Sequence, residues 1–207
     1  MSIAIIGAGN VGAALAKSLT AKGQAVRFGV PDPAKYADLP KQFDGKASVG
    51  TVAQALEGAE VAILAVPYGA AAQVAASIPD WGGRVLIDAT NPLAGLGGLV
   101  VGTTTSGAEE IAKLANNARV VKAFNTAGAE NMIDPQTQAG PVAMPVAGDD
   151  AAARAKAMAL ATLIGFDAMD AGPLKNARYL EPMAMVWIQM ALVLGHGRAW
   201  GWVRGKK

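Results

Sequence analysis

The most informative segment of the chain reads Ile3-Ala4-Ile5-Ile6-Gly7-Ala8-Gly9-Asn10-Val11-Gly12. A short apolar run leads straight into the pattern G-x-G-x-x-G, and an Ala-rich amphipathic stretch follows. In a dinucleotide-binding turn, Gly7 would permit the sharp turn, Gly9 would let a pyrophosphate approach the backbone, and Gly12 would let the helix pack against the strand. Free N–H groups at Asn10 and Val11 would favour the phosphates. The segment therefore predicts an NAD or NADP site, with an ordinary strand–turn–helix as the alternative.

Apolar runs alternate with helical stretches along most of the chain. The runs expected to be strands are residues 3–6, 25–29, 47–49, 61–66, 85–88 and 120–123. The expected helices are 11–22, 52–56, 70–77, 107–116, one that Asp149-Asp150 caps and that ends near 163, and a long apolar one over 174–194. This order predicts an α/β fold with a doubly wound parallel sheet of the Rossmann type. We expect a dinucleotide-binding domain over residues 1–145 and a C-terminal α/β extension over residues 146–207.

Local signals mark several helix starts. Thr51 with Gln54, and Ser106 with Glu109, have the spacing of a capping box. Pro182 lies inside the long C-terminal stretch and is expected to kink it or to mark its first turn.

The composition excludes several classes of function. Cysteine is absent and His196 is the single histidine, which excludes disulfides, thiolate chemistry and a metal site of Cys or His ligands. The formal charge of +2 does not indicate a nucleic-acid partner. No targeting or membrane-spanning segment is evident, so we expect a cytoplasmic protein with no membrane partner. Only 16% of the residues are charged, against a usual value of about 25%, which favours surface hidden in a homodimer.

The nucleotide preference depends on the end of the second strand. NAD sites usually place a carboxylate there to bind the ribose hydroxyls, but this chain reads Gly29-Val30-Pro31. Asp32 follows the proline and is poorly placed for the ribose. Lys35 could meet the 2′-phosphate of NADP or could be a solvated lysine. We expect Val30 and Lys35 to border the nucleotide, and we favour NADP over NAD.

Ligands of a doubly wound sheet lie in a crevice outside the carboxyl ends of the strands. The other ends read Ala65-Val66-Pro67-Tyr68, Asp88-Ala89-Thr90-Asn91-Pro92 and Lys122-Ala123-Phe124-Asn125-Thr126. The residues expected to bind cofactor there are Ala65, Val66, Pro67, Asn91, Phe124, Asn125 and Thr126. Few of these groups titrate, which suits a direct transfer between two bound rings. The sequence singles out no catalytic side chain.

Together with the glycine turn, these segments resemble the family of NADPH-dependent reductases of the deazaflavin coenzyme F-420 (F420). The resemblance continues through Ala147-Gly148-Asp149-Asp150, Asp170-Ala171-Gly172-Pro173-Leu174 and Ala177-Arg178-Tyr179-Leu180-Glu181-Pro182. It implies hydride transfer between NADP(H) and F-420 or a flavin-like acceptor, with both rings stacked in the crevice. Family members follow the second strand with Ser and Arg, which grip the 2′-phosphate; here Val30 and Pro31 stand there, and only Lys35 is basic. The nucleotide domain of transmembrane ferric reductases is also similar.

Single residues have ordinary alternatives. Asn91 precedes Pro92 and could simply start a turn, and Asn125-Thr126 could cap the next helix. Tyr68 could donate a proton in a reduction or could be a packed wall residue. His196, between two glycines, is expected to be a cap or a surface residue. The apolar C-terminal helix is expected at a dimer interface, in the core, or beside the second ring, and it carries Met183, Met185, Trp187, Met190 and Leu194.

Two rival functions remain open from the sequence. One is an NAD(P)-dependent reductase of a small carbonyl or imine, which needs a proton donor such as Tyr68. The other is a dinucleotide-binding protein that senses redox state without turnover.

Overall fold

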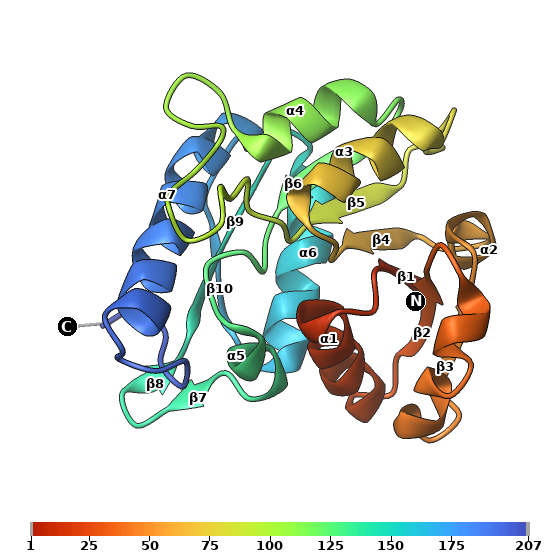
Figure 1. The fold of residues 1–207 in the computed structure, drawn as a ribbon, viewed down its shortest axis with the longest axis horizontal. Helices are drawn as coiled ribbons and strands as arrows, with labels where there is room; N and C mark the ends of the chain where they lie inside the picture. The colour runs from red at the N-terminus through yellow and green to blue at the C-terminus, as the bar shows by residue number, and fades with distance from the viewer. Residues whose placement is uncertain (1, 206–207) are drawn as a thin grey trace.

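Within residues 2–205, which the computed structural model describes, eight strands form one sheet flanked by helices (Figure 1). The strands are β1 (Ser2–Ile6), β2 (Ala25–Gly29), β3 (Ala47–Gly50), β4 (Val61–Leu64), β5 (Val85–Asp88), β6 (Arg119–Lys122), β9 (Ala143–Gly148) and β10 (Asp167–Asp170). Their order is β10-β9-β6-β5-β4-β1-β2-β3. Strands β1 to β6 pair in parallel, whereas β9 pairs antiparallel with β6 and parallel with β10. The predicted doubly wound, mainly parallel sheet is confirmed.

Helices cover both faces of this sheet. They are α1 (Asn10–Ala21), α2 (Val52–Leu56), α3 (Tyr68–Ser77), α4 (Gly107–Leu114), α5 (Ala129–Ile133), α6 (Ala151–Ile164) and α7 (Ala177–Ile188). One core cluster packs α1 and α6 against the sheet, and a second packs α2, α3 and α4 against it. Short 3-10 helices lie at Pro33–Tyr36, Leu39–Phe43 and Leu174–Asn176, and a π-helical segment, Gln189–Val193, follows α7. A small hairpin is formed by β7 (Gln136–Thr137) and β8 (Gly140–Pro141).

Strand β1 shows why the strands read as continuous apolar runs. Ile3 and Ile5 belong to the core cluster that contains α1 and α6, and Ala4 and Ile6 belong to the other. All four residues are at most 1% exposed. Because successive side chains of a strand point to opposite faces, a strand covered on both sides must be apolar at every position. The glycine turn therefore follows a strand that is fixed from both faces.

The predicted caps are observed at three helix starts. At α2, the Gln54 N–H donates to Thr51 Oγ1 at 3.3 Å and the Thr51 N–H donates to Gln54 Oε1 at 2.8 Å, which completes a capping box. At α4, Ser106 Oγ accepts the Glu109 N–H at 3.2 Å, but the Glu109 carboxylate accepts from the Ser106 hydroxyl and not from its backbone. At α6, Asp150 Oδ1 accepts a first-turn N–H at 2.6 Å.

The C-terminal part differs from the sequence-based expectation in two ways. Strands β9 and β10 lie outside the expected strands and extend the sheet beyond β6. β9 is buried but contains Pro145, and β10 is a partly exposed edge strand, so neither gives a clear apolar run. The expected continuous helix over 174–194 is divided into a 3-10 turn, α7 and the π-helical segment. Pro182 lies inside α7 and not in its first turn.

Candidate functional site

The glycine turn between β1 and α1 requires close backbone approach. Gly7 has a φ of +109°, and its N–H donates to the Gly29 carbonyl at 3.0 Å, so β2 fixes the start of the turn. A Cβ at Gly7 would lie 2.5 Å from the Ala65 carbonyl oxygen, and a Cβ at Gly12 would run into the Gly7 carbonyl oxygen. Neither position accepts a side chain without rearrangement of the backbone.

Gly9 differs from both of these glycines. It is exposed, its φ is −77°, and no atom of the described residues lies within 4 Å of where its Cβ would be. Helix α1 begins at Asn10 without a side-chain cap, and the N–H groups of Asn10 and Val11 precede the first intrahelical bond. Free donors, the positive end of a helix and open space together favour an anionic group. The turn therefore fits the pyrophosphate of a dinucleotide.

The end of β4 borders the same turn. The Ala65 N–H donates to the Ile6 carbonyl at 2.9 Å, and a Cβ at Gly7 would lie 2.7 Å from Val66 Cγ1. Ala65 and Val66 are half-buried, and Pro67, the residue before α3, is exposed. The structure thus brings the segment 65–67 beside the glycine turn.

The end of β2 presents few polar side chains. Val30 is 2% exposed, and its N–H donates to the Gly50 carbonyl at 3.0 Å. Asp32 Oδ1 accepts the Ala34 N–H at 3.2 Å, and its Oδ2 lies 3.7 Å from Lys35 Nζ. The Lys35 side chain is 77% exposed. An exposed ion pair contributes about 0–1 kcal/mol, so Lys35 can leave Asp32 for an anionic ligand at little cost.

Two asparagines join the ends of β5 and β6. Asn91 Nδ2 donates to the Asn125 main-chain carbonyl at 2.9 Å. Asn125 Nδ2 donates to Asn91 Oδ1 at 3.0 Å and to the Leu180 carbonyl at 3.2 Å. Phe124, which precedes the second asparagine, has a φ of +62°, an unusual conformation for a bulky residue. The predicted residues Asn91 and Asn125 therefore meet at one point, where α7 also arrives, whereas the ring of Phe124 is buried in the core against Phe166.

Two buried side-chain atoms at this point have no hydrogen-bond partner in the described part of the chain. They are Asn125 Oδ1 and Thr126 Oγ1, in residues that are 4% and 1% exposed. Neither residue caps the following helix, because α5 begins after Gly128 with no side-chain cap. An unpaired buried polar atom costs about 1–3 kcal/mol and is rare. An acceptor and a hydroxyl in neighbouring residues fit a carboxamide, which carries both a donor and an acceptor.

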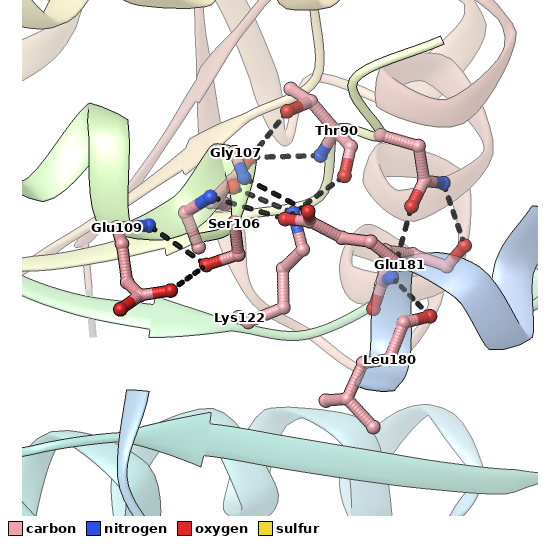
Figure 2. Close-up of polar contacts among 11 residues, drawn as sticks. Thr90, Ser106, Gly107, Glu109, Lys122, Leu180 and Glu181 are labelled. Carbon is pink, nitrogen blue, oxygen red and sulfur yellow. Dashed lines mark hydrogen bonds and ion pairs between the residues drawn. The ribbon is translucent and has the colours of Figure 1, made fainter. Parts of the chain in front are cut away.

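A buried ion cluster, which the sequence pattern did not reveal, joins the ends of β5 and β6 to α7 and α4 (Figure 2). Lys122, at the end of β6, is 0% exposed and donates to Asp88 Oδ2 at 2.7 Å, to Glu181 Oε1 at 2.8 Å and to the Thr90 carbonyl at 2.7 Å. Glu181 also accepts the first two N–H groups of α4, at 2.8 and 3.1 Å. Asp88 Oδ1 accepts the N–H and the hydroxyl of Thr90, at 2.9 and 2.7 Å.

The cluster carries one more carboxylate than ammonium, and the positive end of α4 offsets part of the excess. Burial by itself lowers the pKa of Lys122, but the charges of Asp88 and Glu181 and their hydrogen bonds outweigh burial and raise the pKa above its usual value. The ammonium therefore stays charged at neutral pH. The sequence did contain a signal for this cluster. Lys122 ends an apolar strand and Glu181 lies in an apolar helix, and charges buried in such elements require partners of opposite charge.

Tyr68 begins α3 beside this cluster. Its ring lies 2.8 Å from where a Cβ at Gly107 would be. Burial raises the pKa of the phenol, the charges of Glu181 and Asp88 raise it further, and Lys122 lowers it. A raised pKa makes Tyr68 a poorer acid, which weakens its case as a proton donor.

A groove of about 600 Å³ lies along one flank of α1, between α1, α5 and the 3-10 turn that ends at Phe43. Asn10, Lys17 and Arg198 supply polar atoms to it, and Phe43 and Ile133 supply apolar ones. Among the described residues that were predicted to bind cofactor, Asn10 is the one that lines this groove.

The last helical segment, which consists of α7, the π-helical segment and Leu194, is buried on one side. Trp187 is 5% exposed, and its Nε1 donates to the Trp200 carbonyl at 3.0 Å. Val186 and Leu194 are 50% and 67% exposed, and His196 is exposed beyond them. Part of the apolar helix is therefore core, and part is an apolar surface.

Within residues 2–205, no group of three or more His, Asp or Glu side chains is arranged to hold a metal ion. In the same range, no helix is both long enough and apolar enough to cross a membrane.

The fold and the glycine turn define the class of Rossmann-type dinucleotide-binding proteins. The family model described as "NADP oxidoreductase coenzyme F420-dependent" matches residues 2–92. The F420-dependent NADP reductase of Methanothermobacter marburgensis is 35% identical over 209 residues, which cover 92% of each chain. The chain therefore belongs to the F420-dependent NADP oxidoreductase family.

Two further proteins are similar. A crystal structure from Arthrobacter sp. FB24, described as a candidate F420-dependent NADP reductase, has a TM-score of 0.85 and 29% identity, with both chains covered completely. The rat metalloreductase STEAP3 is 28% identical over 187 residues, which are 88% of this chain and 36% of that protein.

The glycine geometry predicts that Gly9→Ala separates binding from folding. We expect its melting temperature to fall by only about 2–4 °C, the cost of replacing a glycine N-cap by alanine. Its Kd for NADPH should rise at least about tenfold, because the methyl group occupies the space that the pyrophosphate needs. Thermal melts and fluorescence titration measure the two effects.

Gly12→Ala is the comparison, because its methyl group meets the Gly7 carbonyl oxygen inside the protein. This variant should lose far more thermal stability than Gly9→Ala. If Gly9→Ala leaves the Kd for NADPH unchanged, the pyrophosphate does not bind at this turn.

Proposed function

We propose that this protein transfers hydride between NADP(H) and the deazaflavin coenzyme F420 or a flavin-like acceptor. The observation that carries the proposal is a pair of complementary features at the carboxyl ends of the parallel strands. The open glycine turn at Gly9 offers backbone donors to phosphate, and the end of β6 holds unpaired buried atoms in Asn125 and Thr126 that suit a carboxamide. Membership of the family and the 35% identity to an F420-dependent NADP reductase support the same choice.

The chain's own residues would bind and orient the two reactants. The N–H groups of Asn10 and Val11 bind the pyrophosphate, and Asn125 Oδ1 accepts an N–H of the nicotinamide carboxamide. Ala65, Val66 and Pro67 form the wall between the two ends. The reduced nicotinamide would supply the hydride to a carbon of the second ring, and the negative charge left on that ring would be neutralised by a proton from water. In this proposal residues 1–145 bind the dinucleotide. The extension 146–207 contributes α7 to the ring end, which is the part of the site around Asn91 and Asn125 where the nicotinamide binds.

Direct transfer between stacked rings needs no acid from the protein at the donor carbon. This agrees with the scarcity of titrating groups at the strand ends and with the raised pKa of Tyr68. Reduction of a carbonyl or imine would need a well-placed proton donor. The charged groups near the crevice, Asp88, Lys122 and Glu181, are fully buried and already paired.

The assay that tests this proposal is an anaerobic mixture of the protein, NADPH and oxidised F420, followed by the bleaching of the deazaflavin. We expect bleaching with NADPH and slower bleaching with NADH; FMN in place of F420 tests the flavin-like acceptor. If NADPH binds tightly but neither F420 nor any flavin is reduced, the hydride acceptor proposed here is wrong. The search then turns to carbonyl and imine substrates or to a redox sensor.

We also propose that Lys35 supplies the preference for NADP over NAD. Lys35→Ala should raise the Kd for NADPH about 3- to 10-fold, the effect of an exposed charge-assisted hydrogen bond, and should leave the Kd for NADH unchanged. Lys41→Ala is a matched control, because Lys41 is also 77% exposed and also pairs with an aspartate three residues before it. Equal effects of the two substitutions on NADPH binding would contradict the assignment.

We propose a homodimer, in which the exposed apolar residues of the last helical segment, Val186 and Leu194 among them, are covered by a second copy. A molar mass by light scattering at micromolar concentration tests the proposal, and a monomer would contradict it.

A further inference from the structure

We propose that the buried Asp88–Lys122–Glu181 cluster is a positioning unit for the ring end of the nucleotide site. It holds the Leu180 carbonyl in place, and this carbonyl orients the Asn125 carboxamide so that Oδ1 is presented as a hydrogen-bond acceptor. The inference rests on the proposed function, because it takes the nicotinamide carboxamide as the group that Oδ1 receives. Asp88, Lys122 and Glu181 act through Asn125 and are positioning residues.

Lys122 has no freedom within the cluster. An ammonium group has three N–H donors, and Lys122 directs them to Asp88 on β5, to Glu181 on α7 and to the Thr90 carbonyl after β5. All three contacts are 2.7 or 2.8 Å long, and the side chains of the ion pairs are 0% exposed. Water cannot replace a lost partner there, so the two strand ends and α7 must keep their relative positions.

Glu181 is fixed on its other side by helix α4. Its Oε2 accepts the Gly107 N–H at 2.8 Å, and its Oε1 accepts the Ala108 N–H at 3.1 Å as well as a proton of Lys122. Leu180 is the preceding residue of α7, so its carbonyl cannot shift without strain on these contacts. Figure 2 shows the side chain of Glu181 reaching Lys122 and the start of α4, with Leu180 at the opposite, backbone end of Glu181.

Asp88, Lys122 and Glu181 are each close in sequence to a residue that takes part in the hydrogen bonds of the asparagine pair. Asp88 binds Thr90, which precedes Asn91. Lys122 is followed by the short turn that ends at Asn125. Glu181 follows Leu180 directly. The cluster therefore fixes the elements that carry the acceptors of Asn125 Nδ2, which are Asn91 Oδ1 and the Leu180 carbonyl.

These two acceptors determine which way the Asn125 amide faces. A flipped amide would direct its oxygen at the Leu180 carbonyl and at Asn91 Oδ1, which are both acceptors. The observed orientation directs Nδ2 to both and leaves Oδ1 unpaired. If Leu180 moves, the amide loses one of the two contacts that prevent the flip. The cluster thus determines whether Asn125 presents a hydrogen-bond acceptor or a donor to the nicotinamide.

The test compares two ligands that differ in the ring. NADPH and 2′-phospho-ADP-ribose share the adenosine, the phosphates and the second ribose, and the latter lacks nicotinamide. The ratio of their Kd values therefore reports the ring end alone, and thermal melts report stability separately. In the wild-type protein NADPH should bind the more tightly, and Asn125→Ala should reduce that advantage about 3- to 10-fold, the effect of one hydrogen bond.

Glu181→Gln is the decisive variant. A glutamine amide cannot accept hydrogen bonds at both terminal atoms, so one contact with Lys122 or with α4 is lost and Leu180 is released. We expect the same loss of the NADPH advantage, of about 3- to 10-fold. Combined with Asn125→Ala, it should add no further loss, because both substitutions act on one contact. Asp88→Asn removes the ion pair between β5 and Lys122. It should reduce the NADPH advantage by the same factor, so the test remains possible if Glu181→Gln does not fold.

Glu109→Gln is the matched control. Glu109 also joins α4 to α7, through two bonds to Arg178 of 2.6 and 2.8 Å, but it has no contact with the asparagine pair. It should lower the melting temperature and leave the Kd ratio unchanged. If Asn125→Ala lowers the ratio but the cluster variants do not, or if Glu109→Gln lowers it equally, the positioning role is overturned and the proposed function stands. If the wild-type protein does not prefer NADPH over 2′-phospho-ADP-ribose, no ring contact at Asn125 contributes affinity and the positioning role is overturned, while the bleaching of F420 by NADPH decides the proposed function separately.

Discussion

The ends of β5 and β6 and the helices α4 and α7 depend on one buried ammonium group. Lys122 lies at the end of β6 and bonds to β5, to the segment after β5 and to α7, while Glu181 extends the contact to α4. A buried charge deprived of one partner costs several kcal/mol, so these elements are tied together more firmly than apolar packing alone would require. The asparagine pair, with its unpaired oxygen, is part of this tied region.

The glycine turn and the ends of β5 and β6 present their polar groups by different means. At the glycine turn the backbone provides the donors, and the absence of side chains at Gly7 and Gly12 is what allows the close packing. At the ends of β5 and β6, side chains provide the polar groups, and buried charges fix them. A hydride transfer between two rings requires mainly that both are held at the right distance and angle. A rigid frame with few titrating groups suits that chemistry better than acid–base catalysis.

The parts of the fold that the sequence predicted are those decided locally. Apolar runs gave β1 to β6, and Thr51 and Asp150 marked helix starts. Strands β9 and β10 were missed because Pro145 and a partly exposed edge obscure their pattern. Glu181 was quoted only as part of a motif, and its partners come from β6 and from the start of α4, so its role could not be found before the fold was known. Asn125 was predicted correctly to lie at the strand ends, but its orientation depends on Leu180, which pattern alone does not reveal.

In the proposed function, hydride passes directly from the nicotinamide to the acceptor ring. The measurement that tests it most directly uses NADPH carrying deuterium at one or the other face of C4, with oxidised F420 in ordinary water and mass spectrometry of the product. For direct transfer we expect that one of the two labelled forms, and not the other, gives a reduced deazaflavin that contains the deuterium. A reduced product without deuterium from either form would contradict direct transfer, even if the deazaflavin were fully bleached.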